Sequence, residues 1–175
     1  TSQQSFSHSI DLITRTETGW SAPVNIVPRV PAKSRFNPNF APDSSFFLYT
    51  ESSCPSGKEP ALDDLWADEG AECDGDSDNS SKVFAVLPKA GATPIRLGKS
   101  GAPGVMDIGA RGTELADTFP RFSPFQKPQG AGKLFWVTIT SYRRIGALNA
   151  DPAQQQLWMF AIDPAKVLAG QDGSY

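Results

Sequence analysis

Short hydrophobic runs recur along the chain, and turn residues separate them. Residues 9–16 and 20–27 flank Glu17-Thr18-Gly19, a pattern that predicts a β-hairpin. Residues 82–87 and 93–97 enclose a second turn, which contains Pro and Gly, and they predict another hairpin. Such short strands and tight turns are typical of antiparallel sheets.

Other runs are hydrophobic at nearly every position. Phe46-Phe47-Leu48-Tyr49-Thr50 lies between polar turns, and its lack of alternation predicts a central strand that is buried on both faces. Residues 133–140 are rich in β-branched and aromatic side chains and give the strongest strand signal in the chain. Residues 156–162 are expected to pair with them, and both segments are predicted to be core strands.

Helix signals are few. Residues 163–170 begin with a capping Asp followed by Pro and end with Gly, which predicts one or two helical turns. A second short helix is expected at 60–69, and residues 98–117 are interpreted as a long connection. The sequence therefore predicts an all-β fold with long loops and one or two short helices.

Composition narrows the class of protein. The 175 residues include 15 Gly and 15 Pro, which argues against long helices, and the 39% of hydrophobic residues can bury one core. A net charge of -3 gives no electrostatic reason to bind nucleic acid. The longest apolar runs are far shorter than the roughly 20 residues of a membrane-spanning helix, so no membrane span is expected.

Comparing the chain with itself reveals an internal repeat. Residues 37–43, followed by the run at 46–52, match residues 119–125, followed by the run at 134–141. Each copy reads Pro-x-Phe-small-Pro before an aromatic strand, and a further strand follows each copy. The repeated object is therefore a sheet of several strands, and the hairpin at 9–27 looks like the closing strands of a preceding unit.

This pattern resembles the TolB-like, or PD40, family of WD40-like β-propeller repeats, whose units open with a Pro-x-aromatic-Ser-Pro-Asp-Gly turn. Phe40-Ala41-Pro42-Asp43-Ser44 and Phe122-Ser123-Pro124-Phe125 stand at that motif. Ser44 replaces the Gly of the motif, and the second copy lacks the Asp and is expected to have a longer turn, at 125–132. In the first copy, the carboxylate of Asp43 is expected to accept a hydrogen bond from the amide two residues on.

The resemblance implies β-propeller-like antiparallel blades in a single segment, 1–175. Residues 1–30 would form a partial blade, 31–115 a blade with a disulfide and acidic insertion, and 116–175 a blade that the chain end truncates. Closed propellers use about four to eight blades, so about three blades predict an incomplete or open propeller. Its open edge would be covered by further blades, by another chain or by copies of itself. Aromatic residues are expected between neighbouring blades, namely Phe40, Phe47, Phe122, Phe135 and Trp136.

Cysteine usage bears on the compartment. Cys54 and Cys73 bracket a polar loop and predict a disulfide formed in an oxidising compartment, the alternative being two unpaired thiols. The chain starts at Thr1 without a leader, so it is interpreted as a processed chain or a piece of a longer one. With the resemblance, these features predict a bacterial extracytoplasmic protein, in the periplasm or at the cell surface.

An acidic cluster suggests one metal. Asp74, Asp76 and Asp78 alternate along the chain, the spacing by which calcium-binding loops present oxygen ligands. The twelfth loop position, which carries a bidentate Glu in such loops, is Ala85. Calcium is therefore a hypothesis, and a solvated acidic loop is the favoured interpretation. No other cofactor is predicted.

Catalytic signals are weak. His8, the single histidine, lies in a polar segment, and the chain has no nucleophile elbow, phosphate-binding loop, dinucleotide motif or zinc motif. The sequence therefore predicts no enzyme. It predicts a non-enzymatic exported module that serves as a protein-interaction or scaffold subunit of a larger assembly.

Two other functions remain open at this point. One is the propeller portion of a longer prolyl-oligopeptidase-like hydrolase, which would carry a Gly-x-Ser-x-Gly motif outside this chain. The other is a calcium-dependent module that binds glycans or surface polymers. The partner is accordingly another protein, further blades of the same polypeptide, or a glycan.

Overall fold

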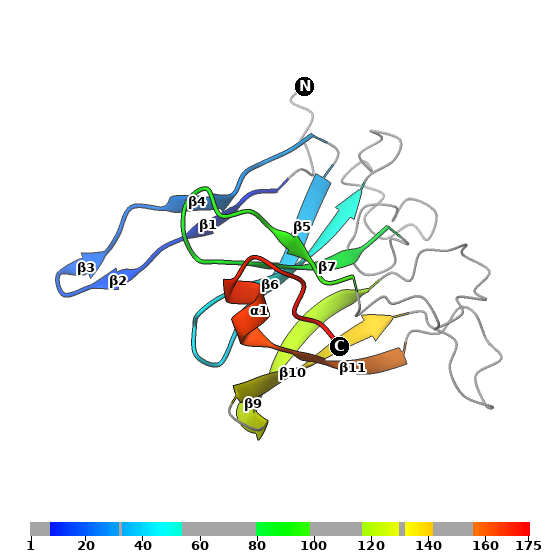
Figure 1. The fold of residues 1–175 in the computed structure, drawn as a ribbon. Helices are drawn as coiled ribbons and strands as arrows, with labels where there is room; N and C mark the ends of the chain where they lie inside the picture. Colours follow the sequence, from blue (N-terminus) through cyan, green and yellow to red (C-terminus); the bar gives the residue numbers. More distant parts are fainter. Residues whose placement is uncertain (1–7, 32, 54–79, 99–116, 130–131, 142–155) are drawn as a thin grey trace, which may run out of the picture.

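The computed structural model describes residues 8–31, 33–53, 80–98, 117–129, 132–141 and 156–175. In these ranges the chain forms antiparallel strands and one short helix, which confirms the predicted all-β fold (Figure 1). The described sheets do not close into a ring.

The N-terminal hairpin, residues 10–27, has two paired regions. β1 (Ile10–Leu12) pairs with β4 (Val24–Val27), and β2 (Arg15–Thr16) pairs with β3 (Gly19–Trp20) at the tip. Gly19 has a φ of 153°, which favours glycine at the turn. The predicted hairpin is therefore confirmed, and its tip projects as an arm from the body of the molecule (Figure 1).

The first sheet is a four-stranded meander in chain order. It consists of β5 (Lys33–Phe40), β6 (Phe47–Ser53), β7 (Lys82–Val86) and β8 (Ile95–Arg96). β6 has a neighbour on each side, and every residue from 46 to 50 is buried. The prediction of a central strand buried on both faces is confirmed, and so is the hairpin formed by β7 and β8.

The second sheet repeats this order with three strands. β9 (Thr118–Gln129), β10 (Gly132–Ser141) and β11 (Gln156–Ile162) are neighbours in sequence order. The helix α1 (Pro164–Leu168) follows β11, and its N-cap Asp163 accepts a hydrogen bond from the amide of Ala165. The predicted strand pair and helix are confirmed.

The turn expected at 125–132 is wrong. β9 continues to Gln129, which lies opposite Gly132, so only residues 130–131 separate the two strands. The prolines of β9 do not prevent this because β9 is an edge strand of its sheet, where a missing N–H need not break a ladder. β5 and β9 themselves were not predicted as strands, because Pro38 and Pro120 interrupt their hydrophobic alternation.

The first sheet lies in the middle of a three-layer stack. Phe46 and Leu48 belong to a core shared with the second sheet, whereas Phe47 and Tyr49 belong to a core shared with the N-terminal hairpin. The period of two along a strand sends alternate side chains to opposite faces, so one strand supplies both cores. We call these the inter-sheet core and the hairpin core.

Aromatic residues fill these cores as predicted at three of the five positions. Phe47 lies in the hairpin core, Phe135 lies in the inter-sheet core, and the ring of Phe122 is 5.9 Å from that of Phe135. Phe40 is 43% exposed, because it stands where β5 leaves the sheet for the turn. Trp136 is half-buried on the face of the second sheet that points away from the first.

The two sheets carry the same bulge. Asn37 and Phe119 both have a φ of 53°, and a proline follows each. Around Asn37, Phe36 lies opposite Thr50 and Asn39 opposite Leu48, which leaves one extra residue in β5. The corresponding residues of β9 lie opposite β10 with the same one-residue excess. The internal repeat read from the sequence is therefore a repeat of backbone conformation.

The shared bulge allows the two sheets to be aligned residue by residue, and we call two residues matched when they occupy the same place relative to the bulge. Thr50 of β6 matches Thr140 of β10, and Leu48 matches Thr138. Because β7 and β11 pair with these strands in the same register, Val83 matches Leu157 by the same rule. The paired positions of β5, β6 and β7 thus have counterparts in β9, β10 and β11.

Candidate interaction surface

The sequence-predicted site residues are not among those described. Cys54, Cys73, Asp74, Asp76 and Asp78 all lie in the range 54–79, outside the described residues. The disulfide and the calcium site therefore stay predictions. Among the described residues, no group of three or more His, Cys, Asp and Glu could hold a metal ion, and no helix is long and apolar enough to cross a membrane.

Arg35 fastens the N-terminal hairpin to the first sheet. Its guanidinium donates to the backbone oxygens of His8, at 3.1 Å, and Pro28, at 2.9 Å, on either side of the hairpin. It also pairs with Glu51, which Lys33 approaches to 3.2 Å. Because the Arg35 side chain is only 5% exposed, this arrangement is structural. His8 contributes its carbonyl, and its ring lies edge-on to that of Phe36, 5.6 Å away.

A hollow of about 460 Å³ lies beside the turn after β5, the start of β10 and α1. Burial alone would raise the pKa of Asp43 there, but hydrogen bonds from Lys133 and Ser45 outweigh it and hold the pKa below its usual value. The Ser45 amide donates to Asp43 at 3.1 Å, which confirms the predicted Asp turn. Asp163, at the other side of the hollow, caps α1. Both carboxylates therefore serve the fold.

Tyr49 has a strongly shifted pKa but no access to a cleft. Burial is the main cause and raises its pKa far above the usual value, and Glu51 raises it further against the opposing effect of Arg35. The side chain is fully buried in the hairpin core. It stays neutral there and packs against the stacked ring of Phe84, whose centre is 5.6 Å away.

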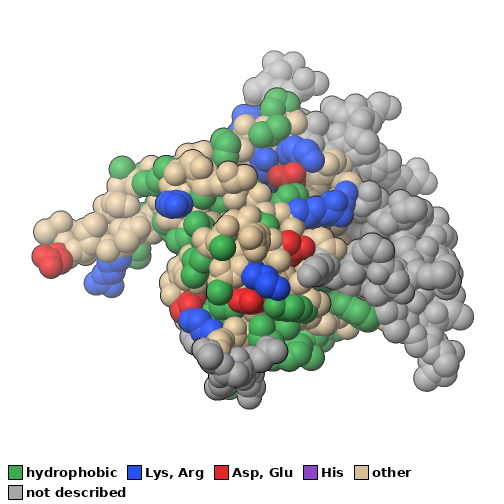
Figure 2. Space-filling view, viewed as in Figure 1, with side chains coloured by type: hydrophobic (Ala, Val, Ile, Leu, Met, Phe, Trp, Pro, Cys, Tyr) green, Lys and Arg blue, Asp and Glu red, His purple; other side chains and the backbone are tan. Residues whose placement is uncertain are grey.

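The far side of the second sheet exposes apolar side chains of two neighbouring strands. In the β10–β11 register, Trp136 lies opposite Ala161, and Thr138 opposite Met159. Leu157 is 74% exposed and Met159 60% exposed. We call this surface the outer face and define it by Leu134, Trp136, Thr138, Thr140, Leu157 and Met159; Ala161 lies on the same side of β11 but is only 6% exposed. Hydrophobic side chains gather along that side of the molecule (Figure 2).

The matched positions of the first sheet are covered. Val83, which matches Leu157, is 2% exposed, and Ala85, which matches Met159, is fully buried. Both lie in the inter-sheet core, where the second sheet covers them. The outer face is therefore the counterpart of a surface that this chain buries once already. Within the described ranges, nothing packs over Leu157 and Met159 in the same way.

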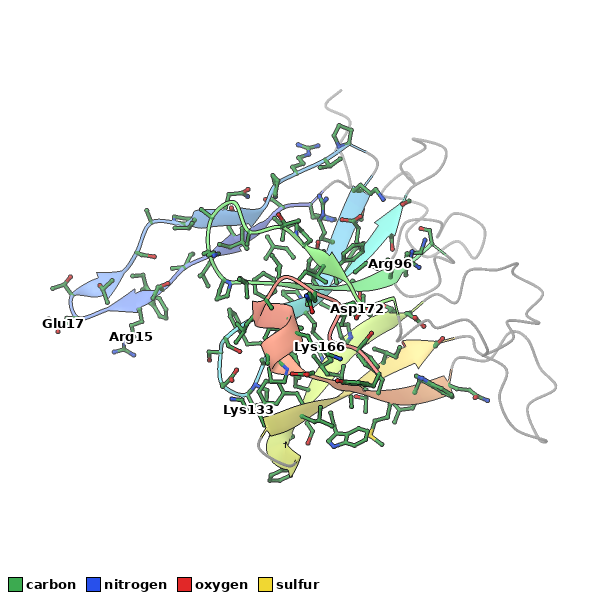
Figure 3. The ribbon with its side chains drawn as sticks, in the orientation of Figure 1. Arg15, Glu17, Arg96, Lys133, Lys166 and Asp172 are labelled. Atoms are coloured by element: carbon green, nitrogen blue, oxygen red, sulfur yellow. The ribbon has the colours of Figure 1, made fainter. Side chains whose placement is uncertain are left out.

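The opposite end of the stack has a mixed exterior, in which Ile13 and Trp20 are 50% and 70% exposed beside polar residues. On the N-terminal hairpin, Ile26 and Val27 face inward and are 1% exposed. Asp11 and Asn25 are exposed and bonded to each other at 2.8 Å. Arg15 and Glu17 extend from the tip of the arm, away from the sheets (Figure 3). The stack thus ends in the hairpin, whose β1–β4 pair carries Asp11 and Asn25 outward, on one side and in the outer face on the other.

Sequence analysis found the outer face only in part. It predicted a core strand at 156–162, and this is wrong for Leu157 and Met159, because only alternate residues of β11 reach the inter-sheet core. The sequence did carry a signal for the outer face, because β10 and β11 have apolar residues on both faces. A strand with one face in water usually has polar residues on that face, so apolar residues on both faces indicate that both are contact surfaces.

Comparisons with protein-family models, with curated proteins and with solved structures give no match for this chain. The interpretation of the outer face therefore depends on the geometry of the chain itself.

Proposed function

We propose that the chain is a non-enzymatic, propeller-type module of the TolB-like repeat kind that acts as a protein-interaction or scaffold subunit of a larger assembly. In this proposal it is a bacterial protein of the periplasm or cell surface. The observation that carries the proposal is the outer face, an apolar sheet surface whose counterpart in the first sheet is buried. Large exposed apolar patches mark interaction sites in folded proteins.

The contact between the two sheets supports a propeller-type arrangement. β5 and β9, the first strands of the two meanders, lie next to each other, and the side-chain oxygen of Asn39 accepts a hydrogen bond from the amide of Phe122 at 2.9 Å. In a propeller, successive meanders likewise meet face to face around a common axis. The shared bulge adds support, because matched units tend to stack in one repeating manner.

The chemistry of the described polar groups supports a non-enzymatic role. Arg35 and Glu51 hold the hairpin, Asp43 holds a turn, and Asp163 caps a helix. Catalytic groups instead converge on a cleft with an accessible acid, base or nucleophile. In the hollow beside α1, the two carboxylates are engaged in a turn and a helix cap, which leaves them structural roles.

Native size tests the proposal. An antibody raised against this chain would detect the protein that carries these residues in envelope fractions of its source, separated on native and denaturing gels. We expect a native mass well above that of one chain. The denaturing gel then separates further blades of one polypeptide from a partner chain. A native protein that migrates as one free copy of this chain, or that is found only in the cytosol, contradicts the proposal.

A further inference from the structure

Both sheets are oriented in the same way relative to the layer that precedes them in the chain. In the first sheet, Phe47 and Tyr49 face the preceding layer, which is the N-terminal hairpin. Their counterparts in the second sheet, Val137 and Ile139, also face the preceding layer, which is the first sheet. Each sheet therefore has a preceding face, turned toward the unit before it, and a following face. The following face of the second sheet is the outer face.

The internal contact shows what a following face receives. Leu48, Val83 and Ala85 on the following face of the first sheet are covered by the preceding face of the second. That preceding face presents aliphatic and aromatic side chains at alternate positions, with Val137, Ile139 and Phe160 at 0%, 0% and 3% exposure. Because this contact is apolar and fully buried, a partner that forms it again is another sheet of similar twist.

We propose that the outer face binds a further β-sheet unit of this same repeat, which docks through its preceding face. This inference rests on the proposed function and names the partner of its surface. The docked unit would cover Trp136, Leu157 and Met159 in the way that the second sheet covers the matched residues of the first sheet. The stack then grows away from the N-terminal hairpin, which already covers the preceding face of the first sheet.

A second copy of this chain does not offer the required surface. The preceding face of its first sheet is covered by the hairpin, and that of its second sheet is covered by the first. The exterior of its hairpin carries Asp11 and Asn25, which are poor partners for Leu157 and Met159 because burying polar groups against apolar ones is unfavourable. A unit with an uncovered preceding face offers the surface that the internal contact uses.

An extended chain tests the inference. Residues 97–175 would be duplicated after Tyr175, so that the new copy of the second sheet can dock on the original outer face. The new copy carries Met159→Leu, which leaves the original Met159 as the only methionine at that position. We expect hydrogen peroxide to oxidise the original Met159 at least about fivefold more slowly in the extended chain than in the unextended chain, measured by mass spectrometry, because docking removes exposed sulfur from solvent.

Leu157→Asp, placed only in the original copy, is the matched control. In the unextended chain it should shift Tm by less than about 4 °C, because the side chain is mostly exposed. In the extended chain it should restore the faster oxidation of Met159. Equal oxidation rates in the extended and unextended chains overturn the inference. So does a new copy that hydrogen exchange shows to be unfolded, because the same residues fold against a following face in the chain itself.

Two further outcomes separate this inference from the proposed function. If light scattering shows a dimer of the unextended chain that Leu157→Asp abolishes, the outer face pairs with itself and the inference is wrong, although an interaction module remains. If the extended chain protects Met159 but the native protein is a free single chain, the inference holds and the proposed function fails.

Discussion

The two sheets share a backbone plan but differ in what surrounds them. Val83 of the first sheet and Leu157 of the second occupy matched positions, yet one is 2% exposed and the other 74% exposed. The difference does not come from the strands, because both are apolar and both carry the same bulge beside them. It comes from the neighbouring layers. Among the described residues, a layer covers each side of the first sheet, but only one side of the second sheet is covered. The burial of a strand residue in a stacked fold thus depends on whether another layer packs on its face of the sheet.

The largest expected effect is a charge at these matched positions. Val83→Asp buries a carboxylate in the inter-sheet core, a cost of several kcal/mol that is a large part of a typical total stability of about 5 to 15 kcal/mol. Leu157→Asp should lower the free energy of unfolding by no more than about 1 kcal/mol. Urea unfolding followed by tryptophan fluorescence compares the two variants. Similar losses would show that Leu157 is covered, and would erase the contrast between the sheets.

The second effect concerns the hairpin that covers the first sheet. At the positions matched to Arg35 and Glu51, the second sheet has Asp117 and Ser141, so it lacks this ion pair. Arg35→Ala should cost about 3 kcal/mol, because it strands the partly buried Glu51 and releases two carbonyls. Hydrogen exchange should show faster opening in β1 and β4 than in β10.

Arg35→Lys and the double variant Arg35→Ala with Glu51→Gln are the controls. Lysine keeps the charge but cannot reach Glu51 and both carbonyls at once, so we expect a smaller loss. The double variant should recover part of the loss by removing the stranded carboxylate. An unchanged hairpin in Arg35→Ala would mean that the hairpin core alone holds it.

The third effect concerns the positive φ angles of the bulge. Asn tolerates the left-handed region, but β-branched residues do so poorly. Asn37→Val should therefore lower the free energy of unfolding by about 1 to 2 kcal/mol, whereas Asn37→Gly should change it by less than about 0.5 kcal/mol. Urea unfolding measures both. If valine were tolerated, the bulge in the first sheet would not need its left-handed residue, and the structural match with the second sheet would weaken.

The smallest effect concerns Asp43, whose matched position in the second sheet is Phe125. The folded pKa of Asp43 is lowered, so its stabilising effect is present above the unfolded value of about 3.9 and is lost as pH falls through the folded value. Asp43→Asn should cost about 0.5 kcal/mol at pH 7, because the pair with Lys133 is largely solvent-screened. The difference from wild type, measured by urea unfolding, should shrink below pH 4. A constant difference would assign the effect to the turn geometry.

Much of the fold could be predicted from local patterns. The alternation at 9–27 gave the N-terminal hairpin, the apolar run at 46–50 gave a central strand, and the Asp, Pro and Gly of 163–170 gave α1. β5 and β9 were missed because a bulge at an X-Pro pair breaks the period on which strand prediction depends. The Asp43 turn was predicted from side-chain chemistry that acts within three residues.

By itself, the sequence determined the strands other than β5 and β9, the repeat, and the apolar residues on both faces of the central strands, because these follow from neighbours along the chain. Only the tertiary structure decided which of those faces is covered. Leu157 and Val83 look alike in sequence, and no local signal says that a second sheet lies over one of them. Burial depends on contacts between residues far apart in the chain, and the outer face exists because the described stack covers one side of its last sheet.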